Sequence, residues 1–561
     1  MQEFDLINSP LEGKNLIEAG AGTGKTFTIS GIYLRLLLEK GLGVEDILVV
    51  TFTIAATEEL RDRIRNRIST ALQYFNTSGS SDVEDNLLCG LEEKIEPRQA
   101  VQRLRTVLQN FDQARIFTIH GFCHRLLTDH AFECSHPFEQ EFISDQSTII
   151  RELVRDFWRR RIQQQNTLFA SYAKTDNLTE DNLLKLTFNW IKHPRINVLP
   201  RPREINTAEL EDAFSTCFEQ AQNSWQSKKS VILDKLCNNP DIKKNKNHEQ
   251  WAQAIDTYLE KDIASINYPE RLANFSTNQL VPGEDVKKNG TPPEHEFFEL
   301  SRKLMETADK LRDLFEQKTI SLQSELLQFV ASELPERKEK LGVLSFDDLL
   351  SRTYSALCNT EQNPLLQTAR QTYRAGLIDE FQDTDPVQCR IFTTIFQDQR
   401  PLFLIGDPKQ AIYGFRGADV YAYLEARQET DRQYTLKTNW RSEEGLLKAI
   451  NQIFASKRPF VFEQIDYQKL QAPDIDQDKI IIQGEPSCGT VIWNTDNCPQ
   501  KSGTKNLAKG VAEEYLATAT AREISRILQL SDQEAAYFRT KTGIRKIGPE
   551  HFAVLVRTHK Q

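Results

Sequence analysis

The feature that most constrains the fold is a glycine-rich stretch near the start of the chain. Residues 19–26 read AGAGTGKT; they follow a short apolar run, NLIEA, and precede a stretch with apolar residues at helical spacing, FTISGIYLRLLL. Glycines let the backbone curl so that its N–H groups face one anion, and the helix that follows presents the positive end of its dipole. Because strand, lysine, threonine and helix are all present, the stretch predicts a phosphate-binding loop rather than a plain glycine turn.

Each position of this loop has an expected role. Lys25 is expected to reach the β- and γ-phosphates of a nucleoside triphosphate, and the Thr26 hydroxyl is expected to contact Mg²⁺. The candidate nucleotide-binding residues are Ala19, Gly20, Ala21, Gly22, Thr23, Gly24, Lys25 and Thr26.

Apolar runs followed by helical patterns recur elsewhere in the chain. DILVVTFT leads into AATEELRDRIRNRI, ARIFTIH leads into GFCHRLLTDHAF, and the same texture returns with AGLIDEFQDTD and PLFLIGDPKQ. Alternating strands and helices predict an α/β fold built on a parallel sheet.

A phosphate site of this type needs a carboxylate from a neighbouring strand. In GLIDEFQDTD the apolar run ends at Asp379 and Glu380. Asp379 is expected to hold Mg²⁺, and Glu380 to polarise the attacking water. Acid pairs after strands are also common in solvated loops, and it is the upstream glycine loop that favours the catalytic interpretation.

Two segments do not show this alternation of strand and helix patterns. Residues 131–344 contain long stretches with helical apolar spacing, such as STIIRELVRDFWRRRI, and few strand signals, which predicts a helical insertion. A last segment begins near YTLKTNWRSEEGLLKAI and ends in HFAVLVRTHKQ, whose apolar run predicts a strand.

Composition sets broad limits on the class of protein. A chain of 561 residues exceeds one ordinary core, so two to four domains are expected. No run of 18 apolar residues and no basic-then-apolar leader occurs, so we expect a cytoplasmic protein without a membrane partner.

The nine cysteines form no C-x-x-C pair, and the nearby His120, Cys123 and His124 lack a second ligand cluster, which disfavours zinc and iron–sulfur sites. The net charge of −10 does not exclude nucleic acid, because binding depends on a local stripe of Lys and Arg.

Several motifs in fixed order carry a family resemblance. DEFQDTDPVQ, GDPKQAIYGFRGAD and NWRSEEGLL follow AGAGTGKT, and together they resemble superfamily 1 DNA helicases of the UvrD, Rep and PcrA kind. LIEAGAGTGKTFTISGIYLRLLL, LVVTFTIAATEELRDRIR, TIHGFCHRLL, SFDDLL and LIDEFQDTDPVQ resemble the RecB branch, with the AddA branch as the nearest alternative. The likeness is dense over about residues 11–130 and 341–450; between them it rests on position and helical character.

The resemblance implies a RecA-like P-loop NTPase sheet with a large helical insertion and the start of a second RecA-like domain. Residues 1–130 and 345–433 would form the first motor domain, 131–344 the insertion, and 434–561 an incomplete second motor domain. The later helicase motifs and the nuclease domain of the RecB branch are expected beyond Gln561, so the chain is expected to be an N-terminal portion.

The resemblance also assigns roles around the nucleotide. Gln410 matches a glutamine that senses the γ-phosphate, and Arg441 matches an arginine that reaches it from across the cleft. Trp440 stands where the family often has Tyr and would stack on adenine. The family's adenine-reading glutamine has no counterpart in FDLINSPLEGKN, which leaves adenine selectivity open.

Candidate DNA contacts come from the same resemblance. Phe52 and Phe415 match aromatic residues on which bases stack, although the residue pattern alone favours two core side chains at strand ends. Lysines near Trp225 and Trp251 predict either a duplex-binding patch or an ordinary surface, and RDRIRNRI favours a solvated helix face. The DNA-binding candidates are Thr51, Phe52, Thr53, His120, Tyr413, Phe415 and Arg416, and the lysines are Lys228, Lys229, Lys243, Lys244 and Lys246.

The resemblance therefore implies an ATP-dependent, Mg²⁺-dependent 3′–5′ DNA helicase of the RecBCD type, acting in double-strand break repair and recombination. Expected partners are single-stranded and duplex DNA and RecC-like and RecD-like subunits in a heterotrimer. An AddA-like or UvrD-like motor without those subunits is one alternative. A non-catalytic DNA-binding remnant is another, although Lys25, Asp379, Glu380, Gln410 and Arg441 are all retained.

Overall fold

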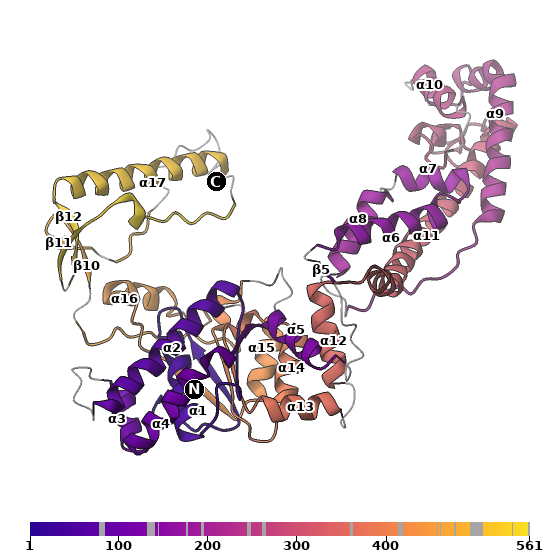
Figure 1. Ribbon diagram of the computed structural model, residues 1–561. Coiled ribbons are helices and arrows are strands. Elements are labelled where there is room, and N and C mark those ends of the chain that lie inside the picture. The colour runs from indigo at the N-terminus through magenta and orange to yellow at the C-terminus, as the bar shows by residue number, and fades with distance from the viewer. Residues whose placement is uncertain are drawn as a thin grey trace. The chain divides into compact units, whose positions relative to one another are not determined.

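The computed structural model describes the chain except residues 78–84, 132–140, 144, 176–177, 192–195, 244–247, 261–264, 359–362, 413, 415–418, 457, 461, 476–477, 488, 494–508, 541 and 559–561. Contacts divide the chain into two compact units (Figure 1). One unit combines Met1–Phe138 with Asp347–Gln561, and the other is Glu139–Phe346. The predicted insertion, residues 131–344, and the second unit overlap over residues 139–344.

The first unit is built on a seven-stranded sheet, and all its neighbouring strands pair in parallel. The predicted parallel α/β sheet is therefore confirmed. Both faces of its central strands are buried, as expected where helices cover a sheet on two sides. In spatial order the strands are β1 (Gln2–Glu3), β9 (Arg432–Leu436), β2 (Lys14–Ala19), β8 (Leu402–Gly406), β7 (Ala375–Ile378), β3 (Ile47–Thr51) and β4 (Arg115–Thr118).

The boundary expected between residues 433 and 434 falls inside β9. This strand pairs with β2 from Asn15↔Arg432 to Ala19↔Leu436, so the sheet of the first unit continues through Leu436. We therefore place the start of the proposed second motor domain after Leu436.

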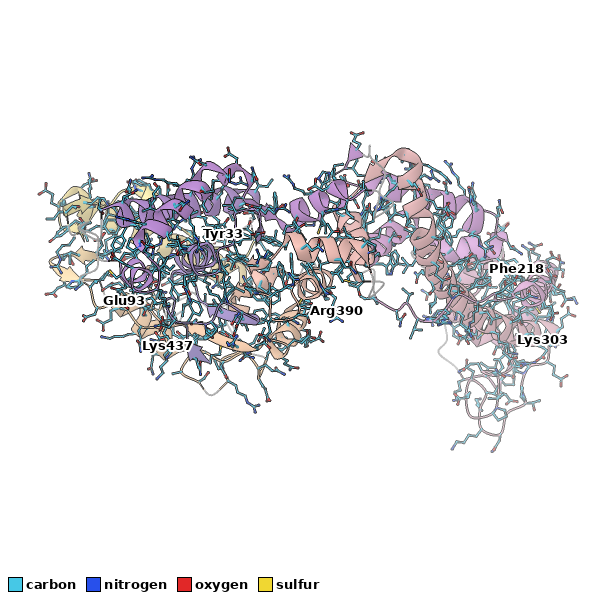
Figure 2. The ribbon with its side chains drawn as sticks, turned by 60° about the horizontal axis from the view of Figure 1, so that its bottom comes forward. Tyr33, Glu93, Phe218, Lys303, Arg390 and Lys437 are labelled. Carbon is cyan, nitrogen blue, oxygen red and sulfur yellow. The ribbon has the colours of Figure 1, made fainter. Side chains whose placement is uncertain are left out.

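Eleven helices are described in this unit, and ten of them precede α17 (Lys509–Asp532). The helix that follows β2 is almost wholly buried, because every residue from Thr28 to Leu38 lies against the sheet or other helices. Tyr33 marks its buried middle in Figure 2. The ten helices before α17 are α1 (Lys25–Glu39), α2 (Ile54–Asn76), α3 (Asn86–Glu92), α4 (Pro97–Gln109), α5 (Ile119–Asp129), α12 (Phe346–Cys358), α13 (Pro364–Thr372), α14 (Pro386–Ile395), α15 (Val420–Gln428) and α16 (Glu444–Ile453).

The second unit is helical and has its own core. All members of this core lie between Ile149 and Leu334, and Phe218 in Figure 2 is one of them. The parallel strands β5 (Glu141–Phe142) and β6 (Val343–Leu344) pair where the chain enters and leaves the unit. Its helices are α6 (Ser147–Phe157), α7 (Thr167–Thr175), α8 (Glu180–Ile191), α9 (Ala208–Cys237), α10 (His248–Leu259) and α11 (Glu296–Leu341).

The last segment forms a small antiparallel sheet and one long helix, α17 (Lys509–Asp532). The strand expected in HFAVLVRTHKQ is wrong, since residues 552–556 form none and Leu555 is 97% exposed. A strand needs a neighbour to satisfy its N–H and C=O groups, and the described residues pair none with this run. The strand order is β11 (Glu485–Pro486), β10 (Lys479–Ile482), β12 (Ala536–Thr540) and β13 (Gly543–Lys546).

Within the part of the chain that the structure describes, none of the helices combines the length and the apolar character needed to cross a bilayer.

Candidate nucleotide-binding site

The topology brings the sequence motifs to one edge of the sheet. The glycine loop follows β2, the acid pair follows β7, Gln410 follows β8, and Trp440 follows β9. These strands are parallel, so their carboxyl ends lie at the same edge, where ligands of open α/β sheets bind. β8 lies between the glycine-loop strand and the acid strand.

The glycine loop leaves the start of α1 open to an anion. Gly22 and Gly24 have φ of 80° and 86°, a left-handed conformation that side chains disfavour. Gly24 is the N-cap of α1, so no side chain caps the helix, and the first turn carries no acid. Uncapped N–H groups and the helix dipole favour a phosphate at this position. The loop also holds itself in shape, because the Thr23 hydroxyl donates to the Gly20 carbonyl at 2.8 Å.

Lys25 lies beside both predicted acids. Its Nζ is 2.6 Å from Glu380 Oε1 and 4.0 Å from Asp379 Oδ1. The Asp379 side chain is 15% exposed, and burial raises its pKa to about 6, against the attraction of Lys25. One carboxylate with the half-buried Thr26 hydroxyl is a donor set that suits Mg²⁺, which takes its other oxygen ligands from water and phosphate. The glycine loop and the acid pair therefore fit a magnesium nucleotide.

The residues after the acid pair add contacts that the sequence analysis did not predict. Gln382 Nε2 donates to Glu380 Oε2 at 2.7 Å, and Gln382 Oε1 accepts from the Asp407 N–H at 2.9 Å. Burial, together with the charge of Glu380, raises the pKa of Asp383 to about 6. DEFQD in the sequence contains these residues, but only the neighbouring strand shows what they contact.

A second charged cluster lies at the end of β8. Gln410 Nε2 donates to Asp407 Oδ2 at 2.8 Å, so this predicted γ-phosphate sensor is held by a buried carboxylate. Lys409 Nζ lies 2.7 Å from Asp407 Oδ1 and also bonds Glu18. Burial works against the charged form of Lys409, but the carboxylates of Asp407 and Glu18 outweigh it and raise its pKa.

The loop after β9 closes onto the glycine loop. The Trp440 N–H donates to the Gly22 carbonyl at 2.7 Å, and Asn439 Nδ2 donates to the Ala21 carbonyl at 2.8 Å. Asn439 Oδ1 accepts from the Arg441 N–H at 2.9 Å, which fixes the backbone of the predicted arginine. The Trp440 ring is 60% exposed, as expected for a side chain that stacks on a ligand. Asn439 is a further contributor that the sequence analysis did not identify.

Comparison with known proteins agrees with this geometry. The UvrD/REP helicase N-terminal domain family matches residues 2–431. The chain belongs to the UvrD/REP helicase family. The expected likeness to the RecB branch is also confirmed, because the RecBCD enzyme subunit RecB of Escherichia coli is 33% identical over 100% of this chain and 47% of its own length.

Other curated relatives carry the same name. RecB of Haemophilus influenzae is 30% identical over 98% of this chain and 48% of its own length. RecB of Mycobacterium tuberculosis is 28% identical over 81% of this chain and 31% of its own length. This UvrD/REP helicase chain thus spans about half the length of the first relatives it matches.

The predicted DNA contacts of this UvrD/REP helicase chain are only partly described. Thr51 is fully buried, and its hydroxyl lies 2.6 Å from the Thr57 hydroxyl within the fold. Thr53 is exposed but caps α2 by accepting from the Ala56 N–H at 3.1 Å. Phe52 and His120 are half-buried, and burial lowers the pKa of His120, which favours a neutral ring. The remaining candidates, Tyr413, Phe415 and Arg416, lie outside the described residues.

The three described lysines near the tryptophans each contact an acceptor within the fold. Lys228 Nζ lies 2.6 Å from Glu296, and Lys229 Nζ lies 2.7 Å from Asp256. Lys243 Nζ donates to the Gly283 carbonyl at 2.8 Å. Both Trp225 and Trp251 are buried in the helical core, and Lys244 and Lys246 lie outside the described residues.

RDRIRNRI behaves mainly as an ordinary amphipathic helix segment. Its isoleucines, Ile64 and Ile68, are buried. Arg63 pairs with Glu59 on the surface, and Arg67 pairs with Asp85. These arginines are therefore occupied within the fold.

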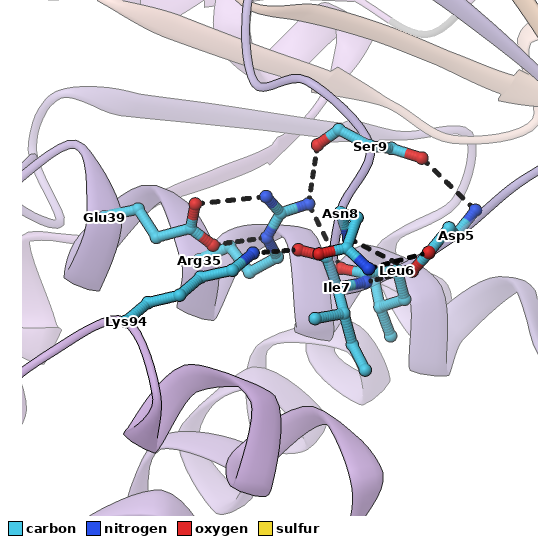
Figure 3. A network of polar contacts seen from close by, with 8 residues as sticks. All are labelled: Asp5, Leu6, Ile7, Asn8, Ser9, Arg35, Glu39 and Lys94. Carbon is cyan, nitrogen blue, oxygen red and sulfur yellow. Dashed lines mark hydrogen bonds and ion pairs between the residues drawn. The ribbon is translucent and has the colours of Figure 1, made fainter.

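The segment before the glycine loop is tied to α1. Arg35 Nη1 donates to the Leu6 and Ser9 carbonyls at 3.1 and 2.8 Å, and Lys94 Nζ donates to the Ile7 carbonyl at 2.6 Å. This loop is thereby held against the helix that begins at the phosphate site. Figure 3 shows the network of Asp5, Leu6, Ile7, Asn8, Ser9, Arg35, Glu39 and Lys94.

Proposed function

We propose that this chain is the N-terminal motor portion of an ATP-dependent 3′–5′ DNA helicase of the RecBCD type, acting in double-strand break repair and recombination. The observation that carries the proposal is the placement of Lys25 beside Glu380 and Asp379, under an uncapped helix start. Membership of the UvrD/REP helicase family and similarity to RecB support the choice of a DNA motor.

The side chains divide the work of ATP hydrolysis. The glycine loop and Lys25 bind the phosphate chain, while Thr26 and Asp379 hold Mg²⁺, which neutralises phosphate charge when it is bound. A phosphate that draws Lys25 away frees Glu380 Oε1 to orient the attacking water. Gln410 and Arg441 are proposed to contact the γ-phosphate, and Trp440 is proposed to stack on adenine.

The proposed partners follow from the relatives. The relatives are named as subunits of the RecBCD enzyme, so we propose a heterotrimer with RecC-like and RecD-like subunits in the cytoplasm. Single-stranded and duplex DNA are the proposed substrates, with Phe52, His120 and Phe415 among the contacts. An AddA-like or UvrD-like motor would act without these subunits, and co-purification with a RecC-like protein separates the two proposals.

The isolated chain is proposed to be a poor ATPase. A nucleotide bound between two motor domains needs cationic groups from both sides to stabilise the transferred phosphoryl group. This chain spans 47% of the Escherichia coli relative, and the second motor domain is proposed to be incomplete within it. DNA-stimulated hydrolysis at the rate of an intact helicase would contradict this proposal.

The direct test is nucleotide binding, measured by the fluorescence of N-methylanthraniloyl ATP with Mg²⁺. Lys25→Ala is expected to weaken binding by about 10–100-fold, the effect of losing hydrogen bonds from a charged group. Lys40→Ala, at the exposed far end of α1, is the matched control and should bind as wild type. A wild-type chain that binds no Mg-nucleotide, or equal affinity in Lys25→Ala, would favour a non-catalytic DNA-binding protein.

A further inference from the structure

Gln382 occupies an unusual position between two strands of the candidate active site. It is 2% exposed, and both ends of its side-chain amide are hydrogen-bonded. Nε2 donates to Glu380 Oε2 at 2.7 Å and lies 3.3 Å from Asp383 Oδ2, while Oε1 accepts from the Asp407 N–H at 2.9 Å. The amide therefore bridges the acid loop after β7 to the end of β8.

The surroundings leave this bridge little freedom. A Cβ added to Gly406 would lie 2.4 Å from Gln382 Oε1, so the amide rests directly on the bare backbone of β8. Glu380 has φ of 52°, a left-handed conformation that a non-glycine residue rarely adopts. A backbone conformation of this kind persists where surrounding contacts determine it, and it is common at active sites.

The bridge continues to the predicted γ-phosphate sensor. The residue whose N–H bonds Gln382 is Asp407, and the carboxylate of the same residue accepts from Gln410 Nε2 at 2.8 Å. Glu380 and Gln410 are thus connected through Gln382 and Asp407. Lys409 holds the other oxygen of Asp407 at 2.7 Å, which keeps that carboxylate from turning.

Each Glu380 oxygen has a different partner. Oε1 faces Lys25 at 2.6 Å, and Oε2 accepts from Gln382. If a phosphate takes Lys25, the Gln382 contact still fixes the plane of the carboxylate and leaves Oε1 directed at the phosphate site.

We propose that Gln382 is a positioning residue that orients Glu380 for water activation and links it, through Asp407, to Gln410. This inference rests on the proposed function, because it assigns a role within the same ATP site. It predicts that losing the Gln382 donor disturbs the transition state of hydrolysis more than nucleotide binding, since position relative to the reacting atoms matters most there.

The test compares two nearly isosteric substitutions in the full chain. Gln382→Glu keeps Oε1 as an acceptor for the Asp407 N–H, and in its ionised form the new carboxylate places an acceptor, not a donor, against Glu380. Gln388→Glu is the matched control, because Gln388 is also buried but completes the capping box of α14 with Asp385, which a glutamate does equally well. Thermal unfolding of both variants verifies that the fold is intact.

The readout is the affinity for N-methylanthraniloyl ADP with Mg²⁺, with and without aluminium fluoride, which imitates the transferred phosphoryl group. Gln382→Glu is expected to bind Mg-ADP with an affinity within threefold of wild type. The gain in affinity that aluminium fluoride causes, here called the tightening, should be at least tenfold smaller in Gln382→Glu than in wild type. Gln388→Glu should keep that tightening. In the double variant with Gln410→Ala, the loss should be smaller than the product of the two single losses, as expected for connected residues.

Each other outcome has a definite meaning. Three results would overturn the positioning role while leaving the proposed function intact. The first is equal tightening in Gln382→Glu and wild type, and the second is an equal loss of affinity with and without aluminium fluoride. The third is a loss in the double variant that equals the product of the two single losses. A wild-type chain whose Mg-ADP affinity does not rise with aluminium fluoride would also overturn it, because Gln382 would then position no group that acts on the transferred phosphoryl group. A wild-type chain that binds no Mg-nucleotide would overturn both.

Discussion

Asp379, the proposed metal ligand, should give the proposed nucleotide site a dependence on pH. Burial raises its pKa to about 6, from an ordinary value of 3.8, and only the ionised carboxylate can hold Mg²⁺. The folded-state pKa is raised, so the protonated form is favoured below about pH 6, and Mg-nucleotide affinity should fall about tenfold per pH unit there. Titration of Mg-nucleotide binding from pH 8 to pH 5 measures this. Asp379→Asn is the control, since it should bind weakly and retain only the pH dependence of the nucleotide and of Asp383, whose pKa is also raised to about 6. An identical pH profile in both proteins would contradict the role of Asp379 as the metal ligand.

Trp440 should discriminate nucleotides from bare phosphate chains. Its ring is 60% exposed, and a Cβ on Gly24 would lie 3.7 Å from its Cδ1, so it stands beside the start of α1. Stacking of a base on an aromatic ring contributes about 1–3 kcal/mol, which predicts about 5–150-fold weaker ATP binding in Trp440→Ala. Calorimetry with ATP and with tripolyphosphate separates the two contributions. Trp440→Tyr should restore most of the ATP affinity, and equal losses for ATP and tripolyphosphate would exclude stacking.

At the scale of elements, the glycine loop and the loop after β9 pack directly against each other. A Cβ on Gly22 would lie 2.7 Å from Arg441 Cβ and 2.8 Å from Asn439 Oδ1, in addition to the strain of a φ of 80°. Gly22→Ala should therefore push the two loops apart and weaken Mg-nucleotide binding at least about tenfold, a loss of about 1.4 kcal/mol.

Gly283→Ala is the matched control for this glycine. Gly283 has φ of 101°, but an added Cβ meets nothing within 4 Å. Gly283→Ala should lower the free energy of unfolding by about 1–2 kcal/mol through backbone strain and should leave nucleotide binding unchanged. Denaturant unfolding and nucleotide fluorescence, measured on both variants, separate strain from loop contact. Wild-type nucleotide affinity in Gly22→Ala would show that the two loops are not coupled.

At the scale of the whole molecule, the helical unit should fold without the rest of the chain. Its core draws only on residues between Ile149 and Leu334, and the paired strands β5 and β6 bring its two ends together. Domains with their own core and adjacent ends tolerate excision. Residues 139–346 expressed alone should show helical circular dichroism and one cooperative thermal transition. The remainder, with 138 joined to 347 through a short Gly/Ser linker, should keep Mg-nucleotide binding. Loss of binding in a folded remainder would show that the helical unit completes the nucleotide site.

Local patterns in the sequence were sufficient for much of this protein. A glycine loop, acids after an apolar run and a tryptophan–arginine pair depend on residues adjacent in the chain. They therefore predicted β2, β7, β8 and the residues that the sheet brings together, Lys25, Asp379, Glu380 and Gln410. The family resemblance supplied the roles, and the likeness to RecB followed from the same motifs.

The tertiary structure decided what depends on contacts between distant segments. Gln382 and Asn439 act through the backbones of Asp407 and Ala21, which no spacing in the sequence reveals. Lys228 and Lys229, two of the lysines that suggested a patch, are paired with acids from other helices, and the apolar run at 552–556 forms no strand. Periodicity reports which residues prefer burial or a given backbone conformation, whereas hydrogen bonds, ion pairs and strand pairing require a partner whose position only the folded chain sets.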